Sequence, residues 1–143
     1  MKGVRRPILR YHGGKWKLAP WIIQHLPPHH TYVEPFGGAA SVLLRKARSH
    51  AEVYNDLNGD VVNLFRVARD HGEKLRQALT LTPFARDEFE ASYVETTDPL
   101  ERARRFECLW LNSAALEGLA QLDFFKAGNA SPSPSFQTMA AHY

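Results

Sequence analysis

The stretch YVEPFGGAASVLL, residues 32 to 44, decides how this sequence folds. It reads as the end of a short apolar strand, then a glycine-rich turn, then the first turn of a helix. The adjacent Gly37 and Gly38 allow positive φ at such a turn, and they let a ligand approach the main chain where a Cβ would obstruct it. The stretch therefore predicts a binding crevice at the junction between a strand and a helix.

A second strand and helix follow this junction. The pattern predicts strands at residues 31–34 and 51–56 and helices at 39–48 and 61–69. The order strand, helix, strand, helix favours an α/β fold with a parallel sheet and right-handed crossovers. We therefore expect an α/β part over residues 1–75.

Helical patterns dominate the rest of the chain. Apolar spacing predicts further helices at 16–26, 74–81, 86–94 and 99–118. Asp98-Pro99 is a good start signal for the last of these, and Ala103, Phe106 and Trp110 form an apolar stripe along it. We expect a second, helical part over residues 76–143. Its final residues form too short and too mixed a stretch for a helix or strand to be assigned.

Composition points to an ordinary globular protein. The chain has 143 residues, enough for one domain with a core, of which 44% are hydrophobic and 23% charged. No apolar run approaches the roughly 20 residues that cross a bilayer, and no signal-like segment opens the sequence. We expect a cytoplasmic protein with no membrane partner.

The positive charge is unevenly distributed. Through Arg76 there are 13 Lys and Arg against 6 Asp and Glu, whereas after it there are 5 against 9. A basic amino-terminal half suits a polyanionic partner, although charged side chains also coat surfaces that bind nothing.

Asp56 adds to the glycine turn. In nucleotide-binding α/β folds the first strand-to-helix turn takes the ligand, and a carboxylate at the end of the second strand accepts hydrogen bonds from ribose hydroxyls. Asp56 follows Gly38 by 18 residues, close to the roughly 20 expected for this role. A purely structural interpretation stays open, in which the glycines form a tight turn and Asp56 caps a helix.

Other common catalytic patterns are missing from the sequence. It contains no GxxxxGK[ST] phosphate loop, no HExxH or CxxC metal motif and no GxSxG elbow. The adjacent His29 and His30 have no partner at metal-ligand spacing. We therefore expect no metal site and no nucleoside triphosphatase.

Three motifs together resemble a known family. They are YHGGK at 11–15, YVEPFGGAAS at 32–41 and YNDLN at 54–58. In this order and spacing they look like the amino-terminal part of Dam-type, D12 class, DNA adenine-specific methyltransferases. The resemblance extends to about residue 120 and implies an incomplete Rossmann-like sheet followed by a helical DNA-recognition segment.

The resemblance also implies a ligand and residue roles. Members of the family transfer a methyl group from S-adenosylmethionine to the exocyclic amine of adenine in double-stranded DNA. By matching position, the residues expected to bind the methyl donor are Tyr11, Lys15, Glu34, Pro35, Phe36, Gly38 and Asp56. Tyr11 would pack on the donor, Lys15 would hold its carboxylate, and Asp56 would take the ribose hydroxyls.

The sequence departs from the family at the catalytic motif. Family members carry Asp-Pro-Pro-Tyr, which holds the target amine and stacks on the flipped base. This sequence has no such tetrapeptide, so its catalytic residues are unknown. The arginines expected after Asn112 and after Leu119 are also replaced, by Ser113 and Ala120.

We therefore expect a truncated or split DNA adenine methyltransferase, encoded by a bacterium or a phage. It would have two strands of a larger sheet, would be inactive alone, and would depend on a second chain for the catalytic half. An alternative is a catalytically dead module that retains affinity for cofactor or DNA, and a further one is a chain that does not fold stably.

Overall fold

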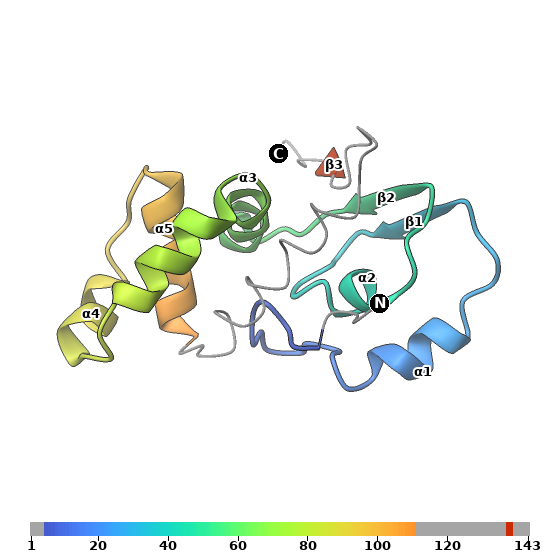
Figure 1. Cartoon of the computed structure of the whole chain (residues 1–143), viewed down its shortest axis with the longest axis horizontal. Coiled ribbons are helices and arrows are strands. Elements are labelled where there is room, and N and C mark those ends of the chain that lie inside the picture. Colours follow the sequence, from blue (N-terminus) through green and yellow to red (C-terminus); the bar gives the residue numbers. More distant parts are fainter. Residues whose placement is uncertain (1–4, 111–136, 139–143) are drawn as a thin grey trace.

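The computed structural model describes residues 5–110 and 137–138. The described elements are α1 (Ala19–Gln24), β1 (Thr31–Glu34), α2 (Ser41–Arg45), β2 (Ala51–Tyr54), α3 (Gly59–Leu81), α4 (Arg86–Ala91), α5 (Pro99–Leu109) and β3 (Gln137–Thr138). The sheet lies with α1 and α2 at one end of the molecule, and α3, α4 and α5 lie at the other (Figure 1). The predicted mixed α/β class is confirmed.

The strands form one parallel sheet in the order β1-β2-β3. Thr31 pairs with Ala51 and Glu34 with Tyr54, so β1 and β2 end at the same edge. The predicted parallel pairing is therefore confirmed, but the expectation of two strands is wrong. The sequence pattern missed β3 because a strand of two residues is too short to show alternation.

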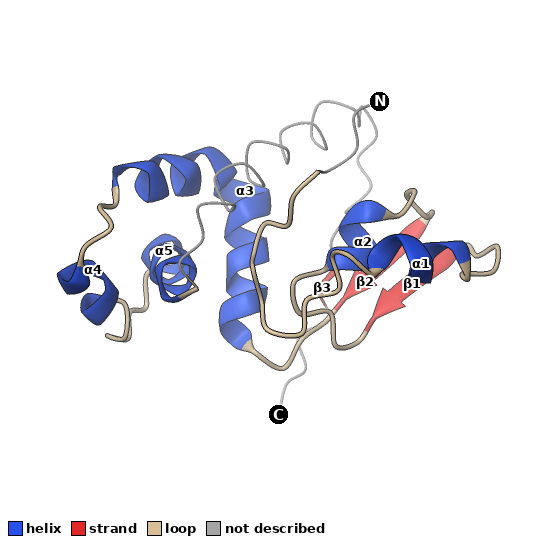
Figure 2. Ribbon diagram, turned by 90° about the horizontal axis from the view of Figure 1, so that it is seen from below, coloured by secondary structure: helices blue, strands red, loops and turns tan. Residues whose placement is uncertain are grey.

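One face of the sheet is covered by helices. Figure 2 shows α1 and α2 together on one side of the strands. Along β1, Tyr32 and Glu34 are partly buried, whereas Thr31 and Val33 are exposed. The N–H of Leu43 in α2 donates to Glu34 at 2.8 Å, which identifies the partly buried side of β1 as the one that faces α2.

The helix after the glycine turn is shorter than predicted. The pattern favoured 39–48, but α2 begins at Ser41 because Ala40 is left-handed, with a φ of 52°. It ends before Lys46, which is extended and whose buried ammonium pairs with Glu52. Neither the left-handed conformation of Ala40 nor the burial of Lys46 can be predicted from the spacing of apolar residues.

The flanking elements α1, β2 and α4 are also shorter than predicted. The helix expected over 16–26 is reduced to α1, and the strand expected over 51–56 ends at Tyr54. After it, the N–H of Asn55 donates to the Glu34 carbonyl at 2.8 Å, and the carbonyl of Asn55 accepts from Gly37 at 2.8 Å. Asn55, the first residue after β2, is therefore hydrogen-bonded to the glycine turn.

The helices predicted at 61–69 and 74–81 are joined in α3. Only His71 departs from helical geometry, with φ −138° and ψ 33°, so the gap in the pattern marks a kink and not a loop. The boundary expected between residues 75 and 76 falls inside this helix, and the division into two parts stays a prediction.

The last helix of the described residues, α5, packs against α3. The Asp98 carboxylate accepts from the Glu101 N–H at 2.6 Å and Pro99 occupies the first turn, as the start signal predicted. Ala103 and Phe106 are buried in the core. The rest of the predicted helix, residues 111–118, and the expected recognition residues beyond it lie outside the described residues.

Among the described residues, no helix combines the length and the apolar character that crossing a lipid bilayer requires.

Candidate functional site

A cleft of about 340 Å³ lies where β1 and β2 end. Ligands of open α/β sheets bind outside the carboxyl ends of the strands, and small-molecule sites begin at about 300 Å³. The residues predicted from the sequence that line this cleft are Tyr11, Lys15, Glu34, Phe36, Gly38 and Asp56. The structure thus brings together six side chains or turn residues that are up to 45 positions apart in the sequence.

Asp56 connects the two turns that border the cleft. Its Oδ2 accepts from the Gly38 N–H at 2.8 Å, and its Oδ1 accepts from the Asn58 N–H at 2.8 Å. Asn58, not Asp56, is the N-cap of α3, because its side chain accepts from the Asp60 N–H at 2.9 Å. The helix-cap interpretation of Asp56 is therefore wrong.

Two bonds to main-chain donors do not saturate the Asp56 carboxylate. An ionised carboxylate has about four acceptor positions on its two oxygens. Asp56 is partly exposed and lines the cleft, so acceptor capacity remains on the ligand side.

Gly37 is required by the packing beneath the turn. A Cβ at this position would lie 2.1 Å from Cε2 of Tyr54, whose side chain is 1% exposed. The Tyr54 hydroxyl donates to the Gly38 carbonyl at 2.6 Å, and burial raises the pKa of this hydroxyl, so it stays protonated. The tight-turn interpretation therefore holds for Gly37.

Gly38 is required by its conformation and borders the cleft. Its φ is +51°, which L side chains rarely adopt, and a Cβ would lie 3.4 Å from Cδ1 of Tyr11. Tyr11 is held in turn by its carbonyl, which accepts from Gly14, and by its hydroxyl, which accepts from Asn58 Nδ2 at 3.3 Å. The turn at Gly38 and the ring of Tyr11 together form one wall of the cleft.

Glu34 places a partly buried carboxyl on another wall. Its Oε1 accepts from the Tyr32 hydroxyl at 2.9 Å and from the Leu43 N–H at 2.8 Å. Burial raises the pKa of Glu34 above its usual value, and these two hydrogen bonds offset part of the rise. The carboxyl is fixed in place by β1 and α2 before any ligand arrives.

Lys15 and Phe36 lie at the mouth of the cleft. The Lys15 ammonium is exposed and donates to the Gly13 carbonyl at 3.1 Å. The Phe36 ring is 79% exposed. Both side chains are therefore accessible to a ligand.

Pro35 does not line the cleft. Its carbonyl accepts from Asn55 Nδ2 at 2.9 Å, so it ties the turn to the end of β2. The structure thus gives Pro35 a place in shaping the turn, and its expected role against the ligand stays a prediction.

Sequence reasoning missed Ile22, Ser41 and His12 in the wall of the cleft. Ser41 is 4% exposed, and its Oγ makes no hydrogen bond to a described residue. A buried hydroxyl without a partner costs about 1–3 kcal/mol, so such groups are rare in folded proteins. Its place in the YVEPFGGAAS motif was the available signal, but the motif was interpreted through its glycines.

The described residues hold no group of three or more His, Cys, Asp or Glu side chains arranged to bind a metal ion. The polar side chains of the cleft are instead two carboxylates, one ammonium, one imidazole and two hydroxyls, from Glu34, Asp56, Lys15, His12, Ser41 and Tyr11. This donor set suits an organic ligand with hydroxyl, ammonium and carboxylate groups.

Comparison with known proteins assigns the family. Residues 11–130 match the family model described as D12 class N6 adenine-specific DNA methyltransferase. The match includes the glycine turn, the cleft residues and α3 through α5.

Individual relatives agree with this match. The chain is 35% identical over 126 residues to a DNA adenine methylase of Serratia marcescens, covering 81% of this chain and 44% of the relative. It is 31% identical over 123 residues to the DNA adenine methylase of Escherichia coli K12, covering 81% and 43%. It is 36% identical over 77 residues to the type II methyltransferase M1.LlaDCHI of Lactococcus lactis subsp. cremoris, covering 52% and 26%.

The chain thus spans less than half the length of these curated relatives. The model match nevertheless covers most of its residues, and the three motifs that carry the resemblance lie inside or at the start of that match. The chain belongs to the D12 class N6 adenine-specific DNA methyltransferase family.

Proposed function

We propose that this chain is the donor-binding part of an enzyme that methylates the exocyclic amine of adenine in double-stranded DNA. The observation that carries the proposal is the convergence of Tyr11, Glu34, Gly38 and Asp56 on one cleft at the carboxyl ends of β1 and β2. The family membership supports the reaction, and the donor set of the cleft supports S-adenosylmethionine as its cofactor.

The residues of the cleft fit the parts of this cofactor. Asp56 would accept hydrogen bonds from the ribose hydroxyls with the acceptor positions that its main-chain contacts leave over. Tyr11 and Phe36 offer aromatic faces, and Gly38 leaves the main chain accessible. When bound, S-adenosylmethionine supplies an electrophilic methyl group on a sulfonium centre.

The amino-acid end of the cofactor would meet the charged side chains. Lys15 would bind its carboxylate, since the Lys15 ammonium is exposed at the mouth of the cleft. Glu34 would face its ammonium, because a carboxylate in a partly buried wall gains most from an opposite charge. Glu34 would be ionised in that complex.

The chain lacks the group that would orient the adenine amine. Direct attack on a methyl carbon needs the nitrogen lone pair aligned with it, and such alignment is worth several powers of ten in rate. The sequence contains no Asp-Pro-Pro-Tyr, and it spans under half of its relatives. We propose that residues outside these 143 supply this motif and the remaining strands of a Rossmann-like sheet.

The basic amino-terminal half supports DNA as the partner, and the segment after α5 would contribute to target recognition. A DNA-modifying enzyme of this kind would act in the cytoplasm of a bacterium, on chromosomal or phage DNA.

A second candidate function is a catalytically dead module that binds cofactor or DNA. It is favoured by the absence of the Asp-Pro-Pro-Tyr motif from a sequence whose donor-cleft residues are present.

Transfer of tritiated methyl groups to adenine-containing duplex DNA separates the two functions. The full chain is assayed alone and with a polypeptide of the same family that carries Asp-Pro-Pro-Tyr. A split enzyme gives no product alone and product with the added polypeptide. A binding module gives none in either case, and product from the chain alone would contradict the expected dependence on a second polypeptide.

A further inference from the structure

The covered face of the sheet carries polar side chains where an apolar layer is usual. In the register of β1 and β2, Tyr32 lies beside Glu52. Glu34 lies beside Tyr54 in the same way, so all four side chains belong to the face that α2 covers. Strands of covered parallel sheets are usually apolar. The cleft accounts for Glu34 and the glycine turn for Tyr54, but neither explains the other two.

Lys46 adds a buried positive charge to this face. Its side chain is 2% exposed, and its ammonium pairs with Glu52 and donates at 2.8 Å to the Ala47 carbonyl and to Ser49 Oγ. The ammonium also lies 4.7 Å from the centroid of the Tyr32 ring. A buried ion pair is often no more stable than apolar residues in its place, so stability alone does not explain it.

Tyr32 connects the buried lysine with the cleft. Its hydroxyl donates to Oε1 of Glu34 at 2.9 Å. Burial, and then the neighbouring Glu34 carboxylate, raise the pKa of Tyr32, so this hydroxyl stays protonated and remains the donor. The N–H of Leu43 donates to the same Oε1, so Oε2 of Glu34 has no hydrogen bond to a described residue. Glu34 lines the cleft, and this second oxygen is available to a ligand.

Tyr32 and Lys46 also act on the charge of Glu34. Burial raises the pKa of Glu34, whereas the hydrogen bonds from Tyr32 and Leu43 lower it. The charge of Lys46 lowers this pKa further, by more than the charge of Glu52 raises it. Both Tyr32 and Lys46 therefore favour the ionised carboxylate, which is the form that attracts a cationic group.

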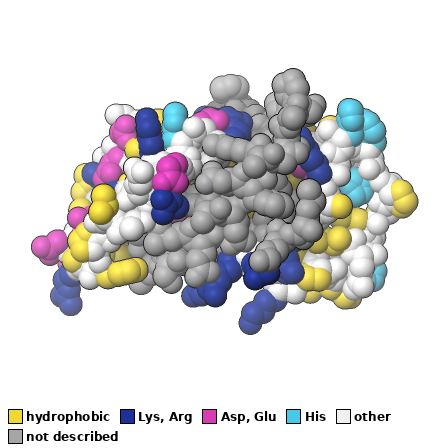
Figure 3. Space-filling view, in the orientation of Figure 1, with side chains coloured by type: hydrophobic (Ala, Val, Ile, Leu, Met, Phe, Trp, Pro, Cys, Tyr) yellow, Lys and Arg dark blue, Asp and Glu magenta, His cyan; other side chains and the backbone are white. Residues whose placement is uncertain are grey.

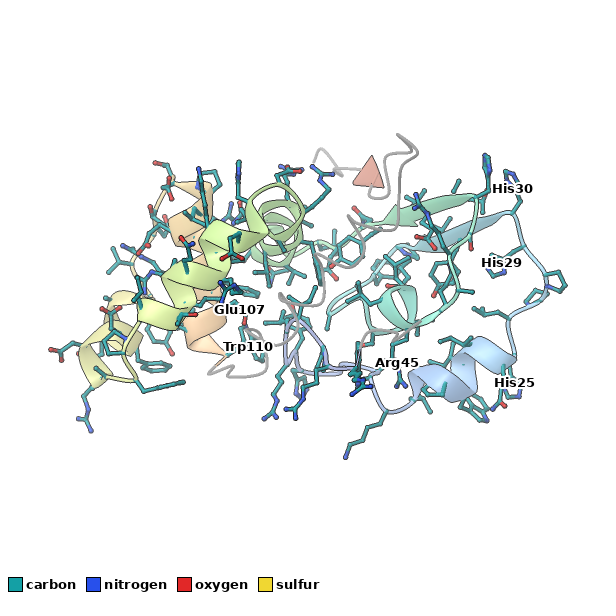
Figure 4. All side chains as sticks on the ribbon, viewed as in Figure 1. His25, His29, His30, Arg45, Glu107 and Trp110 are labelled. Carbon is teal, nitrogen blue, oxygen red and sulfur yellow. The ribbon has the colours of Figure 1, made fainter. Side chains whose placement is uncertain are left out.

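Other titratable groups lie at the two ends of this line. The ring of His29 lies against Tyr32, with centroids 5.7 Å apart, and Figure 4 places His29 and His30 at the end of the sheet where β1 begins. Figure 3 shows His side chains on the surface at the same end. At the opposite end of the strands, the titratable side chains that line the cleft with Glu34 are Tyr11, His12, Lys15 and Asp56.

We propose that Tyr32 and Lys46 are positioning residues of the donor site, which hold the Glu34 carboxyl in one orientation and in its ionised form for the ammonium group of the methyl donor. The proposal rests on the proposed function, from which it takes the ligand of Glu34. It adds to the donor site two residues that do not line the cleft.

The direct test is the titration of the Glu34 carboxyl in the unliganded protein, followed by NMR of its carboxyl carbon. Glu34→Gln identifies the signal by its disappearance. Tyr32→Phe should raise the titration midpoint, because it removes a hydrogen bond to the charged form and keeps the ring that Lys46 contacts. The matched control is Tyr54→Phe, which removes a hydroxyl that donates to the Gly38 carbonyl, and it should leave the midpoint unchanged.

Removal of the buried charge gives a second variant. Lys46→Met is combined with Glu52→Gln, so that no unpaired charge is left in the interior. Because Lys46 lowers the pKa of Glu34 by more than Glu52 raises it, the double variant should also titrate at a higher pH. Circular dichroism shows whether it folds, and if it does not, Tyr32→Phe decides alone, since that change removes only a hydroxyl.

Binding of labelled S-adenosylmethionine is then measured on the same variants across the pH range of this titration. Because ionised Glu34 attracts the donor's ammonium, the affinity of the wild type should fall as pH drops through the midpoint. Tyr32→Phe should weaken binding at neutral pH by roughly 3- to 10-fold, the equivalent of one hydrogen bond, and should move the fall to higher pH. Tyr54→Phe should lower the affinity by the same factor at every pH.

A raised Glu34 midpoint together with a shifted fall in donor affinity supports the positioning role. An unchanged midpoint in Tyr32→Phe overturns it, as does a raised midpoint with the pH dependence of donor affinity left as in the wild type. Absence of donor binding by the folded wild type would contradict the proposed function, whereas the midpoint would still decide whether Tyr32 and Lys46 control the charge of Glu34.

Discussion

The carboxylate of Asp56 accepts a hydrogen bond from the main-chain N–H of Gly38 at 2.8 Å. These residues belong to different connections, one after β1 and one after β2, so the bond ties together the two turns that border the cleft. Its consequence is that one side chain both shapes the cleft and offers acceptors to a ligand. Perturbation of the glycine turn should therefore change stability and donor affinity together.

Gly37→Ala should destabilise the protein. The new Cβ would lie 2.1 Å from the buried Tyr54 ring, which cannot withdraw without leaving the core. Overpacking of this kind costs about 1–3 kcal/mol. Urea unfolding followed by circular dichroism measures the change.

Gly72→Ala is the matched control for this substitution. A Cβ on Gly72 meets nothing within 4 Å, and the residue lies inside α3. Replacing a helical glycine by alanine stabilises by about 0.5–1 kcal/mol. If both alanine variants shifted the unfolding midpoint in the same direction, the contact between Gly37 and Tyr54 would not be the cause.

Tyr54→Phe should weaken the glycine turn without changing its shape. The substitution removes the hydroxyl that donates to the Gly38 carbonyl and leaves that carbonyl without this donor. The expected cost is about 1 kcal/mol of unfolding free energy. Donor affinity should fall with it, and an unchanged affinity in an equilibrium binding assay would show that the turn does not depend on this bond.

Glu101 should make the stability depend on acid. Hydrogen bonds from Arg104 and then Arg105 hold the pKa of Glu101 at about 2, below its ordinary value of 4.5. A carboxyl whose pKa is lowered by folding stabilises above the unfolded pKa, and this stabilisation is lost as pH falls from about 4.5 to about 2. Because the carboxyl is partly exposed, the effect is at most about 1 kcal/mol.

Glu101→Gln should therefore lower the melting temperature at pH 7 and have a diminishing effect as pH falls below 4.5. The comparison is a series of thermal unfolding curves of variant and wild type across this range. A difference that grew on acidification would contradict the assigned ion pairs.

Glu107 should have the opposite dependence on pH. It is 1% exposed on α5, neither carboxyl oxygen bonds to a described residue, and burial raises its pKa well above the ordinary value. The folded protein therefore favours the protonated form, and ionisation at neutral pH costs stability that is regained in acid.

Glu107→Leu should stabilise the protein at pH 7 by about 1–3 kcal/mol, since it removes a buried carboxyl that bonds to no described residue. The gain should shrink as pH falls toward 4. The exposed Glu90 of α4 provides the control, and Glu90→Leu should change neither quantity. A loss of stability in Glu107→Leu would show that the carboxyl has a partner that stabilises it.

The order of the main elements could be predicted because periodicity is a property of residues that are near in sequence. The strand at 31–34 and the helix start at Asp98 were predicted to the residue. The beginning and end of α2 and the continuity of α3 could not be predicted, because they depend on the conformation of Ala40, the buried Lys46 and the packing of α3 on α5. Such contacts join residues that no local pattern connects.

More of the cleft residues than of the helix and strand bounds could be predicted from the sequence, because the cleft residues lie in three motifs of recognisable spacing. Six of the seven predicted residues line it, and Pro35 does not. The contacts of Asp56 with Gly38 and Asn58 could not be predicted, because they depend on how two turns meet in space.

Equilibrium binding of labelled S-adenosylmethionine to the full chain tests the central claim most directly. The wild type should bind, Asp56→Ala should bind at least roughly tenfold more weakly through loss of charged hydrogen bonds to the ribose, and the exposed Asp87→Ala should match the wild type. Equal affinity of the wild type and Asp56→Ala, or no binding by the folded wild type, would contradict a methyl-donor site in this cleft.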